Sequence, residues 1–173
     1  MTLTKHTLSV LVENKPGVLA RIAGMFSRRA FNIYSLAVGP TDDERFSRVT
    51  IVVELDERPV EQVTKQLHKL INVVKIQELS HEDAIERELM MIRVNAPPQT
   101  RFQVVELADI FRAKVIDVGT SSIAVEVTGE PDKLDAFEDL VRPLGIIDIV
   151  RTGRIAIGRG PKRELRAVKS RAG

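Results

Sequence analysis

The sequence predicts an α+β protein made of two tandem βαββαβ units, each an antiparallel sheet with its helices on one face. Hydrophobic residues alternate with a period of two in some segments, which is typical of strands. In other segments they recur at spacings of three and four, which is typical of amphipathic helices. The same order of elements then returns along the 173 residues, giving two repeats of about 70 to 80 residues each.

The first unit is expected over residues 5–80. Leu8, Val10 and Val12 fall on one face of a strand, whereas apolar residues from Val18 to Phe26 follow the helical period. Turn-forming residues at 39–43 separate two strands that should pair as a hairpin. The expected elements are strand 6–13, helix 18–29, strands 31–38 and 46–55, helix 60–70 and strand 73–79.

The second unit is expected over residues 81–158, and its first strand is expected to begin after the charged stretch at 80–88. Pro97-Pro98 and Gly129-Glu130-Pro131 supply turns, and Pro131 suits the first turn of a helix. The expected elements are strand 89–96, helix 102–112, strands 114–118 and 123–128, helix 132–144 and strand 146–150.

The βαββαβ order is the ferredoxin-like arrangement, in which two helices cover one face of a four-stranded sheet. The other face of each sheet is left free. Each unit is therefore expected to cover this open face with a partner.

The composition excludes several classes of function. Hydrophobic residues make up 43% of the chain and charged residues 29%, as in a folded globular protein. Because cysteine is absent, the chain has no disulfide, thiolate metal site or cysteine nucleophile. Aromatic residues are only 4%, which disfavours nucleic-acid binding by base stacking.

The basic residues are concentrated at the C-terminal end. Residues 159–173 hold six Lys or Arg and one Glu, and without them the formal charge falls from +2 to −3. The composition favours a disordered tail over a nucleic-acid footprint.

Residues 1–6 lack a targeting pattern, and no apolar run approaches the roughly 20 residues that cross a bilayer. We therefore expect a cytoplasmic protein without nucleic-acid or membrane partners.

The turn between the first strand and the first helix is the most informative candidate site. Asn14 could cap the helix, and Gly17 would let a ligand approach the backbone. The N–H groups of Gly17 and Val18 could bind a carboxylate, while the amide oxygen of Asn14 could accept from an ammonium group. Asn32, at the entry to the second strand, could face the same ligand or one across a dimer interface. Capping, packing and turn formation remain the alternative roles for these residues.

Other polar clusters carry weaker signals. The runs Asp42-Asp43-Glu44 and His81-Glu82-Asp83 have no second cluster at metal spacing, which favours a solvated turn and a linker over metal sites. An acylphosphatase-type enzyme would need backbone donors where Lys15 and Pro16 stand. An RNA-recognition unit would need aromatic residues on its third strand, and residues 47–52 contain none.

The chain resembles a known family in two long segments. The first is LSVLVENKPGVLARIAGMFSRRAFNIYSLAVGPTDDERFSRVTIVV, followed by KQLHKLINVVKI, which is similar to the N-terminal ACT domain of the acetolactate synthase small regulatory subunit. The second, DKLDAFEDLVRPLGIIDIVRTGRIAIGRG, resembles the C-terminal domain of that family. The resemblance extends over residues 5–160, in order and at the expected spacing, and only the basic tail falls outside it.

This resemblance implies a regulatory subunit with no catalytic residues and no cofactor of its own. Its partner would be the large catalytic subunit, which carries thiamine diphosphate, FAD and magnesium. The chain would activate that subunit and confer feedback inhibition by branched-chain amino acids, most often valine, in valine, leucine and isoleucine biosynthesis. The alternative is a free-standing ACT-type amino-acid sensor that controls another enzyme or a transcription factor.

The resemblance also implies where the effector binds, namely between the ACT domains of two chains in a homodimer. The matching positions form the polar and apolar sides of one pocket. They are Asn14, Gly17, Val18 and Leu19 in one chain, with Asn32 and Ile33 near the facing edge.

Overall fold

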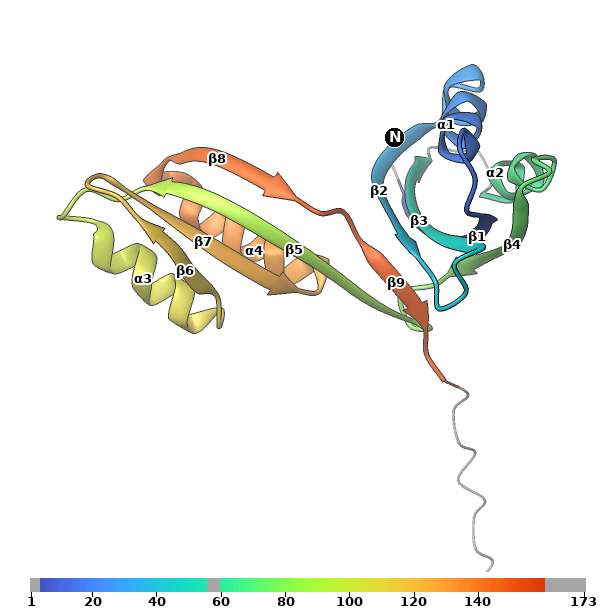
Figure 1. Cartoon of the computed structure of the whole chain (residues 1–173). Coiled ribbons are helices and arrows are strands. Elements are labelled where there is room, and N and C mark those ends of the chain that lie inside the picture. Colours follow the sequence, from blue (N-terminus) through green and yellow to red (C-terminus); the bar gives the residue numbers. More distant parts are fainter. Residues whose placement is uncertain (1–3, 56–59, 161–173) are drawn as a thin grey trace, which may run out of the picture.

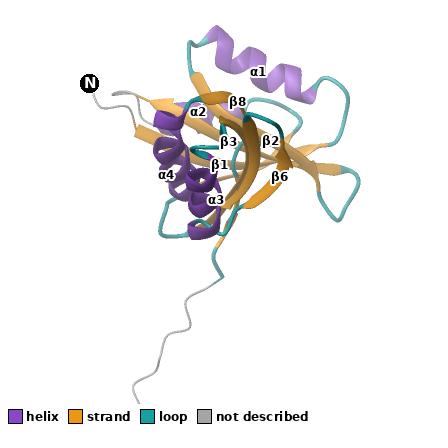
Figure 2. Cartoon of the chain, turned by 90° about the vertical axis from the view of Figure 1, so that its left-hand side faces the viewer, coloured by secondary structure: helices purple, strands orange, loops and turns teal. Residues whose placement is uncertain are grey.

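The computed structural model describes residues 4–55 and 60–160. These residues form two antiparallel sheets, each with two helices packed on one face (Figure 1 and Figure 2). The predicted α+β class with two βαββαβ repeats is confirmed. The expected disordered tail at 159–173 lies outside the described residues, apart from Arg159 and Gly160. In the described ranges, no helix is long and apolar enough to cross a membrane.

The first sheet has the strand order β2-β3-β1-β4, so β2 and β4 lie at its two edges. Leu8 and Val10 of the central strand are fully buried against the helices, where they pack with Ile22 and Phe26. The alternation of apolar and polar residues fixes which face of the sheet carries the core, and Thr7 and Ser9 are buried on the other face. The elements are β1 (Thr4–Glu13), α1 (Val18–Arg28), β2 (Asn32–Pro40), β3 (Phe46–Leu55), α2 (Val60–Leu67) and β4 (Val73–Leu79).

The second sheet has the order β6-β7-β5-β8, and a separate aliphatic core lies under its helices. Phe137 and Leu134 of the last helix pack in this core against Met90 and Ile92 of the central strand. The elements are β5 (Ala84–Asn95), α3 (Arg101–Ile110), β6 (Lys114–Val118), β7 (Ser122–Gly129), α4 (Pro131–Val141), a 3-10 turn (Arg142–Leu144), β8 (Ile146–Arg151) and β9 (Ile155–Gly158).

The expected start of the first strand of the second unit, at residue 89, is wrong. Residues 81–83, which we interpreted as a linker, do lie outside the strands. Strand β5 starts at Ala84, and its first four residues pair with β9, an additional strand that the sequence reading did not predict. The charged residues have partners there: Thr7 donates to Glu86 at 2.7 Å, and Arg151 lies 3.6 Å from the buried Glu88. These contacts allow a charged segment to form a strand between the two sheets.

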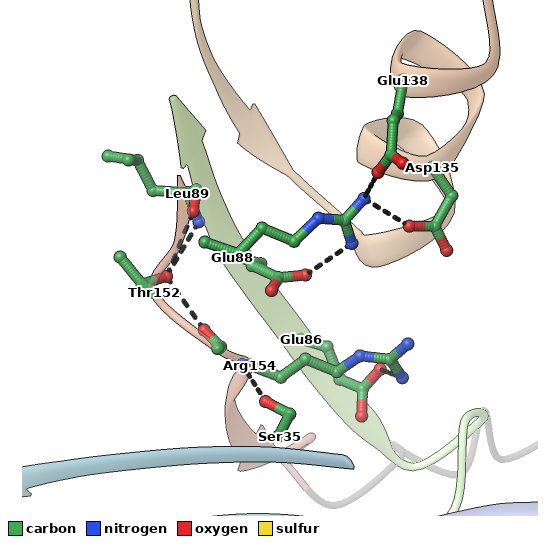
Figure 3. A network of polar contacts seen from close by, with 10 residues as sticks. Ser35, Glu86, Glu88, Leu89, Asp135, Glu138, Thr152 and Arg154 are labelled. Carbon is green, nitrogen blue, oxygen red and sulfur yellow. Dashed lines mark hydrogen bonds and ion pairs between the residues drawn. The ribbon is translucent and has the colours of Figure 1, made fainter. Parts of the chain in front are cut away.

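The ribbon formed by Ala84–Arg87 and Ile155–Gly158 crosses the open face of the first sheet. At one end the backbone N–H of Arg154 donates to the Ser35 hydroxyl on β2 at 2.9 Å (Figure 3). Farther along, Ala84 and Ala156 pack against Leu79 of β4. The ribbon thus runs diagonally from the β2 edge to the β4 edge and covers only part of the face that the helices leave free.

Candidate functional site

The turn before α1 has the backbone conformation that a glycine permits. Gly17 has φ of 83° and immediately precedes Val18, the first residue of the helix. A Cβ atom built on Gly17 would meet nothing within 4 Å, so the space in front of the turn is open. This combination favours glycine for its backbone geometry and leaves room for an approaching molecule.

Asn14 does not cap the helix, contrary to one of its expected roles. Its side-chain Nδ2 donates to the carbonyl oxygen of Glu44 at 3.0 Å, and its backbone N–H donates to the carbonyl oxygen of Arg45 at 2.7 Å. The residue therefore ties the turn to the β2–β3 hairpin. Within residues 4–55 and 60–160, no hydrogen bond occupies its Oδ1 atom, which keeps an acceptor available.

The first amide groups of α1 keep donor capacity. The N–H of Val18 reaches the carbonyl oxygen of Lys15 only at 3.4 Å, and no side chain caps the helix. The N–H groups of Gly17 and Leu19 donate to no other described backbone group. Such unpaired amides carry the positive end of the helix dipole and favour an anion.

A hollow of about 100 Å³ lies beside this turn. Its size suits a small molecule, because drug-sized ligands occupy pockets of roughly 300 Å³ or more. Three of the six predicted site residues, Asn14, Val18 and Leu19, line it. The remaining lining residues are Val12, Glu13, Lys15, Ile22, Val38, Ser47 and Val49.

Asn32 and Ile33 lie elsewhere in the same chain. Asn32 pairs with Glu54 on β3, which in turn pairs with Lys5 on β1, so Asn32 lies near the start of β1 and the turn follows its end. Eight residues of β1 separate the two positions, or about 26 Å of strand. The expectation that Asn32 faces the same ligand within one chain is therefore wrong. Its amide donates to Glu54 at 3.2 Å, and Ile33 packs against the first core.

Glu13 and Val38 are site residues that the sequence reading missed. The Glu13 carboxylate accepts from Asn72 at 2.6 Å and lies 3.2 Å from Lys15. The hydrogen bond from Asn72, together with Lys15, lowers the pKa of Glu13 and keeps it ionised. The hollow therefore has a carboxylate and an ammonium group at its rim. The signal for Glu13 was its position directly before Asn14, whereas Val38 could be placed only once the sheet order was known.

The acidic turn at 42–44 is explained by an ion pair. The Asp43 carboxylate accepts from Arg45 through Nε at 2.9 Å and Nη2 at 2.6 Å, and this partner lowers the pKa of Asp43 to about 2. In the part of the chain that the structure describes, no three His, Asp or Glu side chains are grouped to hold a metal ion.

Two tandem βαββαβ units and a glycine turn opening the first helix define this chain as a regulatory protein of the ACT-domain class. Residues 8–75 match the family model described as an AHAS small subunit-like ACT domain, and residues 87–160 match the small subunit of acetolactate synthase.

Full-length relatives agree with the two family models. The chain is 57% identical to the probable acetolactate synthase small subunit of Archaeoglobus fulgidus, over 92% of this chain and 99% of that relative. It is 53% identical to the acetolactate synthase small subunit of Mycolicibacterium smegmatis, over 91% and 92% of the two chains. The crystal structure of the small subunit from Thermotoga maritima has a TM-score of 0.82 at 38% identity, covering 91% of this chain and 99% of that one.

The chain therefore belongs to the acetolactate synthase small-subunit family, as the resemblance indicated. A small subunit is the regulatory partner of a catalytic large subunit, and the first unit of this chain is an ACT domain.

Proposed function

We propose that the chain activates its catalytic subunit and confers feedback inhibition by a branched-chain amino acid, with valine as the preferred effector. The observation that supports this proposal is the small hollow beside the Gly17 turn, which combines aliphatic walls with groups of both charges. The catalytic subunit would hold thiamine diphosphate, FAD and magnesium, and this chain would hold none of them. Both subunits would act in the cytoplasm, without nucleic acid or membrane.

The chemistry of the hollow matches a free amino acid with an aliphatic side chain. The open amides at the start of α1 suit the carboxylate, and Asn14 Oδ1 with the Glu13 carboxylate suits the ammonium group. Val18, Leu19 and Val38 would contact the side chain. Burying a branched side chain contributes a few kcal/mol at most, so the polar groups must fix the orientation.

A homodimer through β2 would complete this site. Strand β2 lies at the edge of its sheet, and Tyr34 and Val38 are large apolar side chains exposed on it. If two copies pair their β2 strands antiparallel about a two-fold axis, the start of one strand meets the end of the other. The turn of one chain would then lie near Asn32 of the partner subunit. The separation of Asn14 and Asn32 within one chain is thus what an effector site between two ACT domains requires.

Calorimetric titration with valine, leucine and serine tests the effector assignment, with threonine as the near-isosteric control for valine. We expect saturable valine binding that is lost in Asn14→Ala and kept in Asn95→Ala, which removes an exposed amide from the second unit. Adding the purified chain to the catalytic subunit should raise its activity, and valine should reverse the increase. A chain that binds valine but leaves the catalytic subunit unchanged would instead be a sensor for another target.

Mixing two inactive variants tests the dimeric site. Asn14→Ala and Asn32→Ala chains, refolded together in equal amounts, would form mixed dimers with one intact site. We expect calorimetry to recover about one quarter of the wild-type sites, since half of the dimers are mixed and each has one of its two sites intact. No recovery would show that both residues act within one chain or that one of them is not in the site.

A further inference from the structure

The ribbon leaves an uncovered triangle on the open face of the first sheet. Because it runs from Ser35 on β2 to Leu79 on β4, it passes beside the end of β2 and the neighbouring part of β3 without covering them (Figure 1). Ala37 pairs with Thr50 and Gly39 pairs with Arg48 across these two strands. The uncovered area therefore has mainly small side chains as its floor.

A groove of about 290 Å³ occupies this triangle. Ala37, Gly39 and Thr50 lie at its floor, and three isoleucines from the ribbon form its wall. Ile85 and Ile157 are directly paired across the ribbon, and Ile155 lies on the same face two residues before Ile157.

Two of the three isoleucines in the wall are more than half exposed. Ile155 is 59% exposed and Ile157 is 61% exposed, although both belong to a regular strand. The opposite face of the same ribbon carries the small residues Ala84 and Ala156, which are buried against the sheet. A contiguous apolar surface next to a groove is typical of a protein interaction site.

The charge at the groove is positive. The Arg48 guanidinium donates to the Ser9 hydroxyl at 2.8 Å and has no carboxylate partner among the described residues. Arg87 donates to the backbone carbonyl oxygen of Glu86 at 2.6 Å, and its only ion pair among the described residues is a 3.5 Å contact with Glu130, in which both side chains are at least half exposed. The chain's own residues 159–173 would be repelled, because they hold six basic residues and one acidic residue.

We propose that this groove is the docking surface for an apolar segment of the catalytic subunit that carries at least one acidic side chain. Aliphatic side chains of that segment would cover the isoleucine wall, and its carboxylate would pair with Arg48. This inference rests on the proposed role of the chain as an activator of the catalytic subunit. It assigns the contact to the ribbon and to the end of β2.

Binding of the catalytic subunit to fluorescently labelled full-length chain tests the proposal without relying on activation. Ile157→Glu should weaken binding by about tenfold or more, because it places a charge at the centre of an apolar contact. Ile110→Glu is the matched control, since Ile110 is 67% exposed at the end of α3, in the second unit. Arg48→Glu should also weaken binding, while Arg48→Lys should keep most of it.

The possible outcomes separate the two proposals. Equal binding by wild type, Ile157→Glu and Arg48→Glu would overturn the docking surface and leave the activator role intact. Tight binding without activation would overturn the activator role, and absence of wild-type binding would overturn both. If Ile157→Glu instead changed only the sedimentation of the free chain, the groove would be a contact between two copies and the proposal would be wrong.

Discussion

Replacing Gly17 by Asp is expected to abolish valine binding and feedback inhibition while leaving activation of the catalytic subunit in place. Gly17 has φ of 83°, a conformation that costs an L-residue about 1–2 kcal/mol. Gly17→Asn is the matched control, because Asn has nearly the same shape as Asp and also tolerates this backbone region. The strain common to the two variants cancels in the comparison, which leaves the charge.

The magnitude follows from the position of the new carboxylate. No atom lies within 4 Å of a Cβ at Gly17, so the Asp side chain would occupy the open space in front of the amides of α1. Two carboxylates about 4 Å apart, at an effective dielectric constant of about 20, repel each other by about 4 kcal/mol, or about a thousandfold in affinity.

Calorimetry with valine, and inhibition of the reconstituted enzyme by valine, would both measure the effect. We expect Gly17→Asn to bind valine and Gly17→Asp to show no binding at millimolar valine, with both variants activating the catalytic subunit. If Gly17→Asp bound valine as well as Gly17→Asn, the helix amides would not hold the effector carboxylate, and the site would have to be placed elsewhere.

Three further predictions concern the stability of the fold, the pKa of Asp43 and the attachment of the ribbon to the first sheet. Arg151→Met should lower the free energy of unfolding by about 3 kcal/mol in urea titrations, because it removes the cation beside Glu88, whose side chain is only 5% exposed. The pKa of Asp43, which is about 2 beside Arg45, should rise toward its usual 3.8 in Arg45→Ala, as followed by NMR. In the wild type, the contribution of this pair to the free energy of unfolding should be present above pH 4 and lost as the pH falls through 2. Gly153→Ala should increase hydrogen exchange in the ribbon, since its Cβ would lie 3.0 Å from a backbone carbonyl oxygen of β2 and its φ is 81°.

Local periodicity was sufficient to predict most elements. Strands Phe46–Leu55, Val73–Leu79 and Lys114–Val118 have the predicted bounds, because alternating apolar residues and flanking turn residues mark both of their ends. Helix α1 ends one residue before the predicted end, at Arg28. Each of these elements is specified by neighbours in sequence, so no knowledge of the tertiary structure was needed.

The ribbon could not be predicted in the same way. Strand β9 has only four residues, and its partner at the start of β5 is separated from it by about 70 positions. The alternation along this part of β5 places Glu86 on the face that meets the first sheet, where Thr7 donates to it. A partly buried carboxylate in a charged stretch gives no signal of a strand until the hydroxyl that donates to it is located.

The candidate site shows the same division between local and long-range information. The turn with Asn14 and Gly17 is recognisable because its residue types are unusual at the start of a helix. The position of Asn32 depends on the strand order, which puts it at the opposite end of the sheet from the turn. Only pairing with a second copy would return it to the site, and a single chain carries no local signal for that pairing.

Strand β2 connects the surfaces proposed for the effector, the second copy and the catalytic subunit. Val38 lines both the hollow beside the Gly17 turn and the groove beside the ribbon, and it is 50% exposed on an edge strand. Ser35, on the same strand, accepts the hydrogen bond from Arg154 that anchors the ribbon. An amino acid and a catalytic-subunit segment bound as proposed would therefore contact the same side chain. A shift of β2 by a fraction of an ångström on effector binding would alter the groove directly, so feedback would need no relay through the second unit.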